Sequence, residues 1–245
     1  AIMVSCDTFF YELSVKLGIT RIHKMLTRFG FGKTTQVDMP DELPGLLPSP
    51  HWKHETNGNP WYTGDTILTG IGQGFLLATP LQIAEATATL AEHGERFQPH
   101  LLLKMQKPDD SIYQLPAIEK PPVILEHPSV WNNVIHAMQG VVSSPMGTAE
   151  SFGRHPGYTV AAKTGTAQVF GHHRDEERSR LNIPKKLRNH HLFIAFAPVN
   201  HPQIAVAIVI EHAAGADRIA RHIMDYYFKY CAKEDKVKTN EQPTR

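Results

Sequence analysis

The spacing of apolar residues changes along this chain, from helical over much of its length to strand-like runs between residues 158 and 210. Helical spacing predicts helices over about residues 8–17, 21–28, 80–93, 129–142 and 216–230. The third of these has the clearest start, because Thr79 can cap it, Pro80 suits its first position and Gln82 completes a capping box. Residues 31–65 have no sustained period, so we expect a long and mostly irregular segment there.

Apolar runs of strand length predict three strands, over residues 158–163, 192–197 and 203–210. Shorter extended segments are expected over residues 97–105 and 112–115. Helices, then three hairpin-connected strands, then a helix indicate an α/β fold of the α+β type, in which helices pack on an antiparallel sheet. We expect this domain to cover residues 1–231, and the polar stretch 232–245 to be disordered.

The composition is that of an ordinary globular protein, with 41% hydrophobic and 20% charged residues in 245. A formal net charge of +1 gives no reason to expect nucleic acid as a partner. The longest apolar run, residues 204–210, is far shorter than the roughly 20 residues that span a bilayer. No signal peptide is visible at residue 1, although a membrane anchor could lie upstream. Two cysteines, Cys6 and Cys231, do not make a disulfide framework.

The stretch Lys163-Thr164-Gly165-Thr166 is the most informative in the chain, because its residue types suit a carboxylate-binding ledge. The two threonines offer hydroxyl donors and the lysine offers positive charge. Glycine removes a side chain where a substrate backbone must lie close. On its own, however, such a triplet arises often by chance, and the lysine could equally be a surface residue at a strand end.

A second element, Ser5-Cys6-Asp7, precedes the first predicted helix. Serine and aspartate are common capping residues, so a purely structural role is open. Alternatively, the Ser5 hydroxyl relays a proton and Asp7 projects into a cleft. A hydroxyl can pass protons to an ammonium within hydrogen-bond reach, and Lys163 is the natural partner.

Together, Ser5-Cys6-Asp7 and, some 156 residues beyond Asp7, Lys163-Thr-Gly-Thr resemble the second and third motifs of the class B penicillin-binding serine transpeptidases. The intervening stretches 61–66, 70–74 and 78–82 are also similar to that family. The resemblance implies a penicillin-binding transpeptidase or serine β-lactamase-like fold.

The family's nucleophile motif, Ser-x-x-Lys, is missing, since none of the nine serines has a lysine three residues later. In the family this motif precedes Ser-x-Asp. We therefore expect a C-terminal part of a transpeptidase domain, incomplete at its N-terminal side and inactive alone.

The resemblance also implies a role for each motif residue. Ser5 would help carry the proton to the leaving D-alanine amine, and Lys163 would orient Ser5. Asp7 would stand where many relatives have asparagine. Thr164 and Thr166 would bind the terminal carboxylate of D-Ala-D-Ala or of a penicillin. The backbone N–H of Thr166 would form half of an oxyanion hole.

The implied activity is that of a peptidoglycan D,D-transpeptidase acting in cell elongation, a serine-type D-Ala-D-Ala transpeptidase or carboxypeptidase inhibited by β-lactams. No organic cofactor is required. The implied partners are the stem peptide and a membrane glycan polymerase of the elongation machinery. The implied setting is the periplasmic face of the bacterial inner membrane, through an anchor upstream.

Two further features invite a metal interpretation. Cys6 could join upstream ligands around a structural zinc, or could simply be a small residue at a helix start. The pairs His172-His173 and His190-His191 cannot chelate one ion from a regular strand, because neighbouring side chains point to opposite faces. The sequence 70–74 lacks the lysine-containing ending of a phosphate loop.

Two other classes of function stay open. One is a non-catalytic sensor or scaffold that recognises penicillin without turnover. The other is a serine β-lactamase, which would need a water-activating base that the sequence does not reveal.

Overall fold

The structure is a computed structural model that describes residues 1–149, 152–153, 157–169 and 184–232. The chain forms two compact units. The first consists of Ala1 and Cys6–Asn132, and the second consists of Ile2–Ser5 together with the residues from Asn133 onward. The predicted domain, 1–231, contains both units. Residues 170–183, with the His172-His173 pair, and the stretch 233–245 lie outside the described residues.

The first unit opens with helix α1 (Asp7–Arg28), which joins the first two predicted helices. The junction is Gly18, whose φ of 73° and ψ of 156° are not helical. Cys6 is the N-cap residue, so neither Ser5 nor Asp7 occupies the capping position that its residue type left open. The kink at Gly18 follows from the freedom of glycine to adopt a positive φ.

Two short helices, α2 (Pro50–Asn57) and α3 (Thr63–Gly70), lie where an irregular segment was expected or just after it. Their apolar spacing is weak, and polar contacts hold them instead. Lys53 of α2 has a side chain only 7% exposed, and its Nζ lies 2.5 Å from Oδ2 of Asp65 in α3. Burial alone would raise the pKa of Asp65, but the bond from Lys53 and the Tyr62 N–H hold that pKa below its ordinary value.

Helix α3 packs closely against α1 at a glycine. A Cβ added at Gly70 would collide with the side chain of Ser14. Ser14 is buried, and its hydroxyl donates to the Phe10 carbonyl at 2.6 Å. A small residue on each helix therefore allows the two backbones to approach.

Helix α4 (Pro80–Ala91) begins as predicted, with the Thr79 hydroxyl accepting the Gln82 N–H and the Gln82 side chain accepting the Thr79 N–H. Its buried side chains are largely polar. Thr87 and Thr89 can be buried because their hydroxyls donate to backbone carbonyls of the same helix. The spacing of apolar residues alone therefore does not predict which side chains of this helix are buried.

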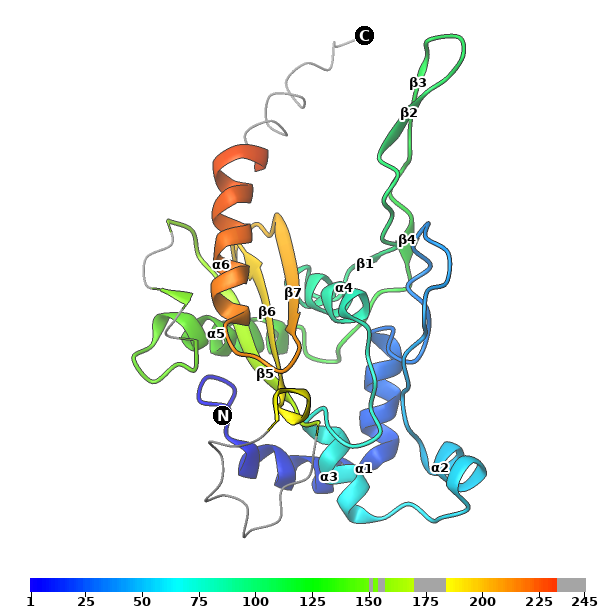
Figure 1. The fold of residues 1–245 in the computed structure, drawn as a ribbon, viewed down its shortest axis with the longest axis vertical. Helices are drawn as coiled ribbons and strands as arrows, with labels where there is room; N and C mark the ends of the chain where they lie inside the picture. Colours follow the sequence, from blue (N-terminus) through cyan, green and yellow to red (C-terminus); the bar gives the residue numbers. More distant parts are fainter. Residues whose placement is uncertain (150–151, 154–156, 170–183, 233–245) are drawn as a thin grey trace. The chain divides into compact units, whose positions relative to one another are not determined.

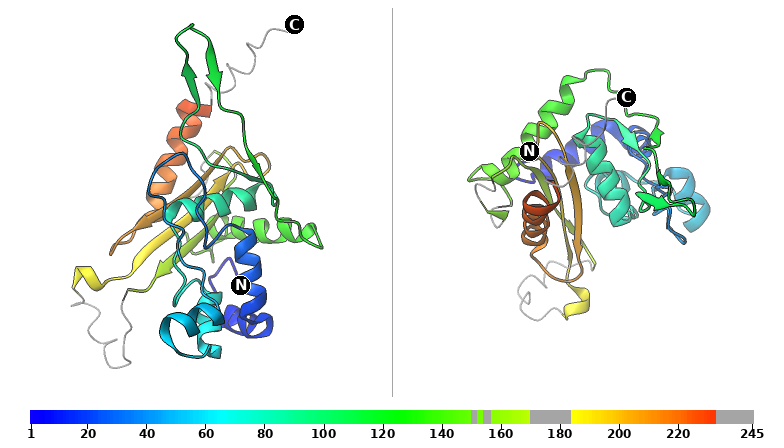
Figure 2. Two further views of the ribbon diagram at one scale, coloured as in Figure 1. Left: turned by 90° about the vertical axis from the view of Figure 1, so that its right-hand side faces the viewer. Right: turned by 90° about the horizontal axis from the view of Figure 1, so that it is seen from above.

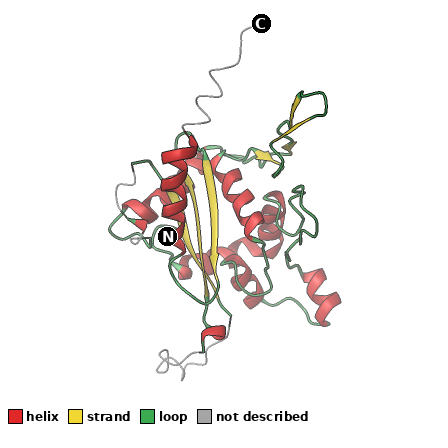
Figure 3. Cartoon of the chain, turned by 45° about the horizontal axis from the view of Figure 1, so that its top comes forward, coloured by secondary structure: helices red, strands yellow, loops and turns green. Residues whose placement is uncertain are grey.

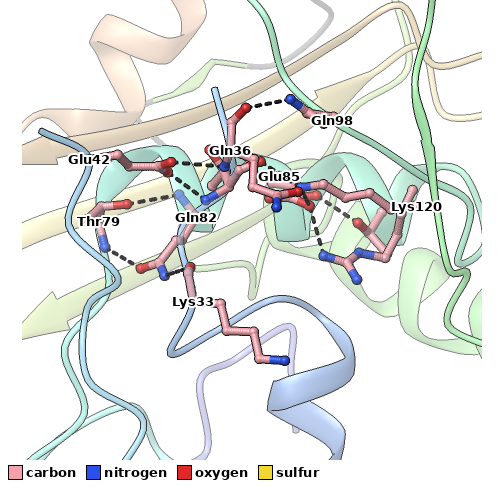
Figure 4. Close-up of polar contacts among 11 residues, drawn as sticks. Lys33, Gln36, Glu42, Thr79, Gln82, Glu85, Gln98 and Lys120 are labelled. Atoms are coloured by element: carbon pink, nitrogen blue, oxygen red, sulfur yellow. Dashed lines mark hydrogen bonds and ion pairs between the residues drawn. The ribbon is translucent and has the colours of Figure 1, made fainter. Parts of the chain in front are cut away.

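Polar side chains from α4 hold the irregular segment before α2 in place (Figure 4). The Gln82 amide donates to the carbonyls of Lys33 and Pro44, at 2.7 Å each. Glu85 Oε1 accepts from Arg96 at 2.8 Å and from Lys120 at 2.9 Å. The segment thus has few regular hydrogen bonds of its own and uses those of buried side chains instead.

Four short strands complete the first unit as two separate two-stranded antiparallel sheets. Strand β1 (Arg96–Phe97) pairs with β4 (Glu119–Lys120), and β2 (Lys104–Gln106) pairs with β3 (Ile112–Gln114). Every residue of β2 and β3 is exposed. Strand β3 lies within the extended segment predicted over residues 112–115, whereas β2 overlaps only the end of the one predicted over residues 97–105.

The second unit is built on a three-stranded antiparallel sheet in the order β5-β6-β7, seen in Figures 1 and 2. The strands are β5 (Ala161–Ala167), β6 (His190–Ala197) and β7 (Ile204–Ile210). All three were predicted, but β5 starts and ends later than expected. Lys163, Thr164, Gly165 and Thr166 consequently lie within the strand rather than at its end.

Helix α6 (Ala216–Tyr226) packs on β6 and β7, and continues as the π-helical turn η4 (Tyr227–Cys231). Helix α5 (Ser129–Ser143) adds Val141 and Val142 to the same apolar core. A short 3-10 turn, η3 (Lys185–Leu187), precedes β6. Figure 3 shows these helices around the sheet. Within the described residues, no helix combines the length and apolar character needed to traverse a bilayer.

Candidate active site

Ser5 and Lys163, which are 158 positions apart, meet in the second unit. The Lys163 Nζ donates to the Ser5 Oγ and also to the Thr164 carbonyl, the latter at 2.7 Å. An ammonium has three donors and no acceptor. The Ser5 oxygen therefore accepts from Lys163, and its own proton remains available to a different acceptor. The predicted contact between Ser5 and Lys163 is confirmed.

The backbone explains how each of these two groups is positioned. Lys163 pairs with Ile194 in the middle of the β5–β6 ladder, so its backbone is fixed by the sheet. Ser5 has a φ of 49°, in the left-handed region that costs a non-glycine residue about 1–3 kcal/mol. Its N–H donates to the Ile2 carbonyl at 3.2 Å, which closes the turn that presents the hydroxyl.

Thr148 is a site residue that the sequence did not reveal. Its hydroxyl lies 2.8 Å from that of Thr164 on β5. The loop carrying it folds back onto the end of α5, where the Ala149 N–H donates to the Val141 carbonyl at 3.1 Å. A Cβ at Gly147 would collide with that carbonyl, so glycine permits the turn. No pattern in the sequence relates Thr148 to β5.

An open cavity of about 410 Å³ adjoins the threonines of β5. It is lined by the end of β5, the start of β6, Thr148 and the first turn of α6, namely Thr148, Thr164, Gly165, Thr166, His191, Leu192, Phe193, Ala214, Gly215, Ala216, Asp217 and Arg218. This volume lies within the range of small-ligand sites, about 300–1,000 Å³. The cavity is thus large enough for the end of a peptide.

Gly165 has a packing role in addition to the predicted open ledge. A Cβ at this position would approach the Leu192 Cβ to 3.1 Å, which is closer than ordinary side-chain contact. Leu192 is its partner across the β5–β6 ladder. Glycine therefore lets the two strands pack at the point where the cavity begins.

Asp7 and Cys6 belong to the first unit. Asp7 lies exposed in the first turn of α1, at the positive end of the helix dipole. The Cys6 Sγ lies 3.4 Å from the Thr8 hydroxyl. That hydroxyl and the Phe9 N–H hold the pKa of the Cys6 thiol below its ordinary value.

A lowered thiol pKa suits a metal ligand, since zinc binds the thiolate. In the part of the chain that the structure describes, however, no three His, Cys, Asp or Glu side chains gather as a metal site. A zinc ion at Cys6 would therefore need ligands from outside the described residues. His190 instead accepts the His212 N–H through Nδ1 at 3.2 Å, and the two rings lie 4.5 Å apart.

Residues 1–226 match the family model of the penicillin-binding protein transpeptidase domain. The peptidoglycan D,D-transpeptidase MrdA of Salmonella typhimurium is 38% identical over 232 residues, which is 93% of this chain and 37% of that protein. The chain therefore spans little more than a third of the length of this curated relative.

Solved structures agree with the sequence match. The structure of Pseudomonas aeruginosa PBP2 in complex with WCK 5153 has a TM-score of 0.75 and 40% identity, over 92% of this chain and 47% of that one. Helicobacter pylori PBP2 in complex with MreC also has a TM-score of 0.75, with 30% identity over 94% of this chain and 38% of that one.

Proposed function

Because the chain belongs to the penicillin-binding protein transpeptidase family, we propose that it forms part of the catalytic domain of a peptidoglycan D,D-transpeptidase. The observation that carries this proposal is the hydrogen bond from Lys163 to the Ser5 hydroxyl, beside two threonines that line a cavity. A longer polypeptide would supply the nucleophilic serine and its lysine. Substrate, partners and activity of the whole protein are part of the proposal.

The reaction divides into two acyl transfers. In the first, the nucleophilic serine gives up its hydroxyl proton and attacks the carbonyl of the penultimate D-alanine, the peptide C–N bond breaks, and the leaving amine takes up a proton. In the second, the amine of a neighbouring stem peptide attacks the acyl-serine and loses a proton, the ester C–O bond breaks, and the serine oxygen regains a proton. Transfer to water instead would give carboxypeptidase activity.

Ser5 and Lys163 act in the proton transfers. Since Lys163 occupies one lone pair of the Ser5 oxygen, the Ser5 proton can be donated toward the leaving amine. Ser5 would then recover a proton from the lysine of the nucleophile motif. The Lys163 charge keeps the hydroxyl oriented through both steps. Groups positioned in this way typically contribute about 10²–10⁴-fold to rate.

The threonines and glycine of β5 would hold the end of the substrate. Thr164 and Thr166 line the cavity, and their hydroxyls would bind the terminal carboxylate of D-Ala-D-Ala or of a β-lactam there. The Thr166 N–H would supply one oxyanion donor, a contribution of about 3–4 kcal/mol in comparable enzymes. The Asp7 carboxylate would accept a hydrogen bond from a donor group of the substrate peptide.

We place this protein in cell elongation, at the periplasmic face of the inner membrane, with a membrane glycan polymerase as partner. The named complex of Helicobacter pylori PBP2 with MreC supports an elongation role. A structural zinc that uses the Cys6 thiolate belongs to the same proposal, with its other ligands outside the described residues. Elemental analysis of the purified protein and of Cys6→Ala tests it.

The test of function uses the longest natural polypeptide that contains this chain, labelled with a fluorescent penicillin. We expect a covalent band whose rate of formation falls about 100-fold or more in Ser5→Ala and Lys163→Ala. Ser143→Ala is the matched control, because this exposed hydroxyl donates only to the Gln139 carbonyl of its own helix. Absence of a band in the wild type would favour a scaffold, and rapid release of hydrolysed penicillin would favour a β-lactamase.

A further inference from the structure

The side chains of Lys163 and of the two threonines leave strand β5 on opposite faces. Successive side chains of a strand point to opposite faces. Lys163 pairs with Ile194, whereas Thr164 pairs with Phe193 of the opposite face, which stacks on Phe152 in the apolar core. The Lys163 ammonium is directed to Ser5 and to a backbone carbonyl. With Lys163 engaged in these two bonds, a carboxylate on the threonine side would pair with a different cation.

Arg218, in the first turn of α6, lines the same cavity as Thr164 and Thr166. The Arg218 guanidinium lies over Gly215, because a Cβ added at Gly215 would be 3.2 Å from the Arg218 Nη2. The φ of Gly215, 108°, also favours glycine at this position. Arg218 is exposed. Among the residues that the structure describes, no carboxylate forms an ion pair with it. The cavity thus has a guanidinium available at its rim.

The rest of the cavity wall is compatible with an anion. The N-terminal end of α6 presents backbone N–H groups and the positive end of its dipole at residues 216–218. Asp217 also lines the cavity, but its side chain or backbone is already engaged in an interaction with another group. A guanidinium can bind both oxygens of a carboxylate in a planar fork, which a hydroxyl cannot do.

We propose that Arg218 is a specificity-determining residue that pairs with the terminal carboxylate of the donor peptide while Thr164 and Thr166 donate to it. This inference rests on the proposed transpeptidase function. It assigns the two basic residues different tasks: Lys163 serves the Ser5 proton relay, and Arg218 serves carboxylate recognition. Thr148, which bonds to Thr164, would orient the hydroxyl of that threonine.

The experiment compares acylation of the longest natural polypeptide containing this chain by benzylpenicillin and by its methyl ester, which lacks the negative charge. In Arg218→Gln we expect the second-order rate constant for benzylpenicillin to fall tenfold or more and that for the ester to stay within twofold of wild type. Arg218→Lys should retain an intermediate rate, because it keeps the charge and loses the fork.

Arg188→Gln is the matched control, since it removes the same charge from an exposed residue before β6 that does not line the cavity. Neither rate constant should change in this variant. If Arg218→Gln slows acid and ester equally, or leaves the acid unaffected, Arg218 does not read the carboxylate and the inference fails while the transpeptidase proposal stands.

Lack of acylation in the wild-type protein would refute the proposed function. A second measurement tests the carboxylate site in that case. Saturation-transfer NMR would compare diacetyl-Lys-D-Ala-D-Ala with its C-terminal amide. Binding of the acid but not the amide, lost in Arg218→Gln, supports the carboxylate site. Equal binding of both, or binding unaffected by Arg218→Gln, overturns it.

Discussion

The substitution Glu85→Gln tests whether buried polar side chains hold the first unit together. Glu85 Oε1 accepts from Arg96 at 2.8 Å and from Lys120 at 2.9 Å, and the three side chains are only 7%, 11% and 12% exposed. Lys120 also donates to the Thr35 carbonyl at 2.8 Å. Glutamine keeps the shape and one acceptor oxygen, but it removes the negative charge that offsets the two cations of this triad.

The expected loss can be worked from these contacts. Removing one partner of a buried ion pair typically costs about 3–5 kcal/mol, because the remaining charge is left uncompensated. The amide oxygen of the introduced glutamine would recover about 1 kcal/mol as a neutral hydrogen bond, while the two cations repel each other more strongly. We therefore expect the free energy of unfolding of the first unit to fall by about 3–4 kcal/mol.

Tryptophan fluorescence during urea unfolding measures this unit selectively, because Trp52, Trp61 and Trp131 all lie within it. With a slope of about 1–3 kcal/mol per molar urea, a loss of about 3–4 kcal/mol lowers the midpoint by about 1–4 M. Glu92→Gln, at the exposed end of the same helix, is the control and should change stability by less than about 0.5 kcal/mol.

A double variant, Glu85→Gln with Lys120→Met, removes one of the two uncompensated cations and should recover part of the loss. The reasoning is refuted if Glu85→Gln costs less than about 1 kcal/mol. It is also refuted if the double variant is no more stable than the single one.

Two further predictions concern pH and the site. The pKa of Asp65 is lowered in the folded protein, so the stability that its carboxylate contributes is present above the unfolded pKa of about 3.9 and is lost as the pH falls through the folded pKa. When the pH is lowered below about 4, the tryptophan-monitored urea midpoint should therefore decrease, and it should decrease less steeply in Asp65→Asn. Equal slopes in the two proteins would contradict this prediction. Gly147→Ala should displace the loop that carries Thr148, and should slow penicillin acylation with little change in the tryptophan-monitored urea midpoint. Gly64→Ala is the control, because its added methyl group points into open space, and it should leave acylation unchanged. Equal acylation rates in the two variants would show that the Gly147 turn is dispensable.

Local sequence was sufficient wherever neighbouring residues determine the structure. The capping box of α4 depends on residues three apart, and β6 and β7 are apolar runs that cannot be solvated without cost. Apolar periodicity missed α2, although its ends carry local signals: the Ser49 hydroxyl accepts the Trp52 N–H at its start, and Gly58 ends it with a positive φ. A polar helix of eight residues has little periodicity to detect.

The site divides in the same way. Residue types and their order identified Ser5, Lys163 and the threonines of β5, since those motifs are specific in combination. Only the tertiary structure decided that the Lys163 ammonium reaches Ser5, that Thr148 bonds to Thr164, and that Arg218 lines the cavity. These contacts join residues on different elements, and their geometry is set by sheet register and loop packing, which no local pattern in a single sequence encodes.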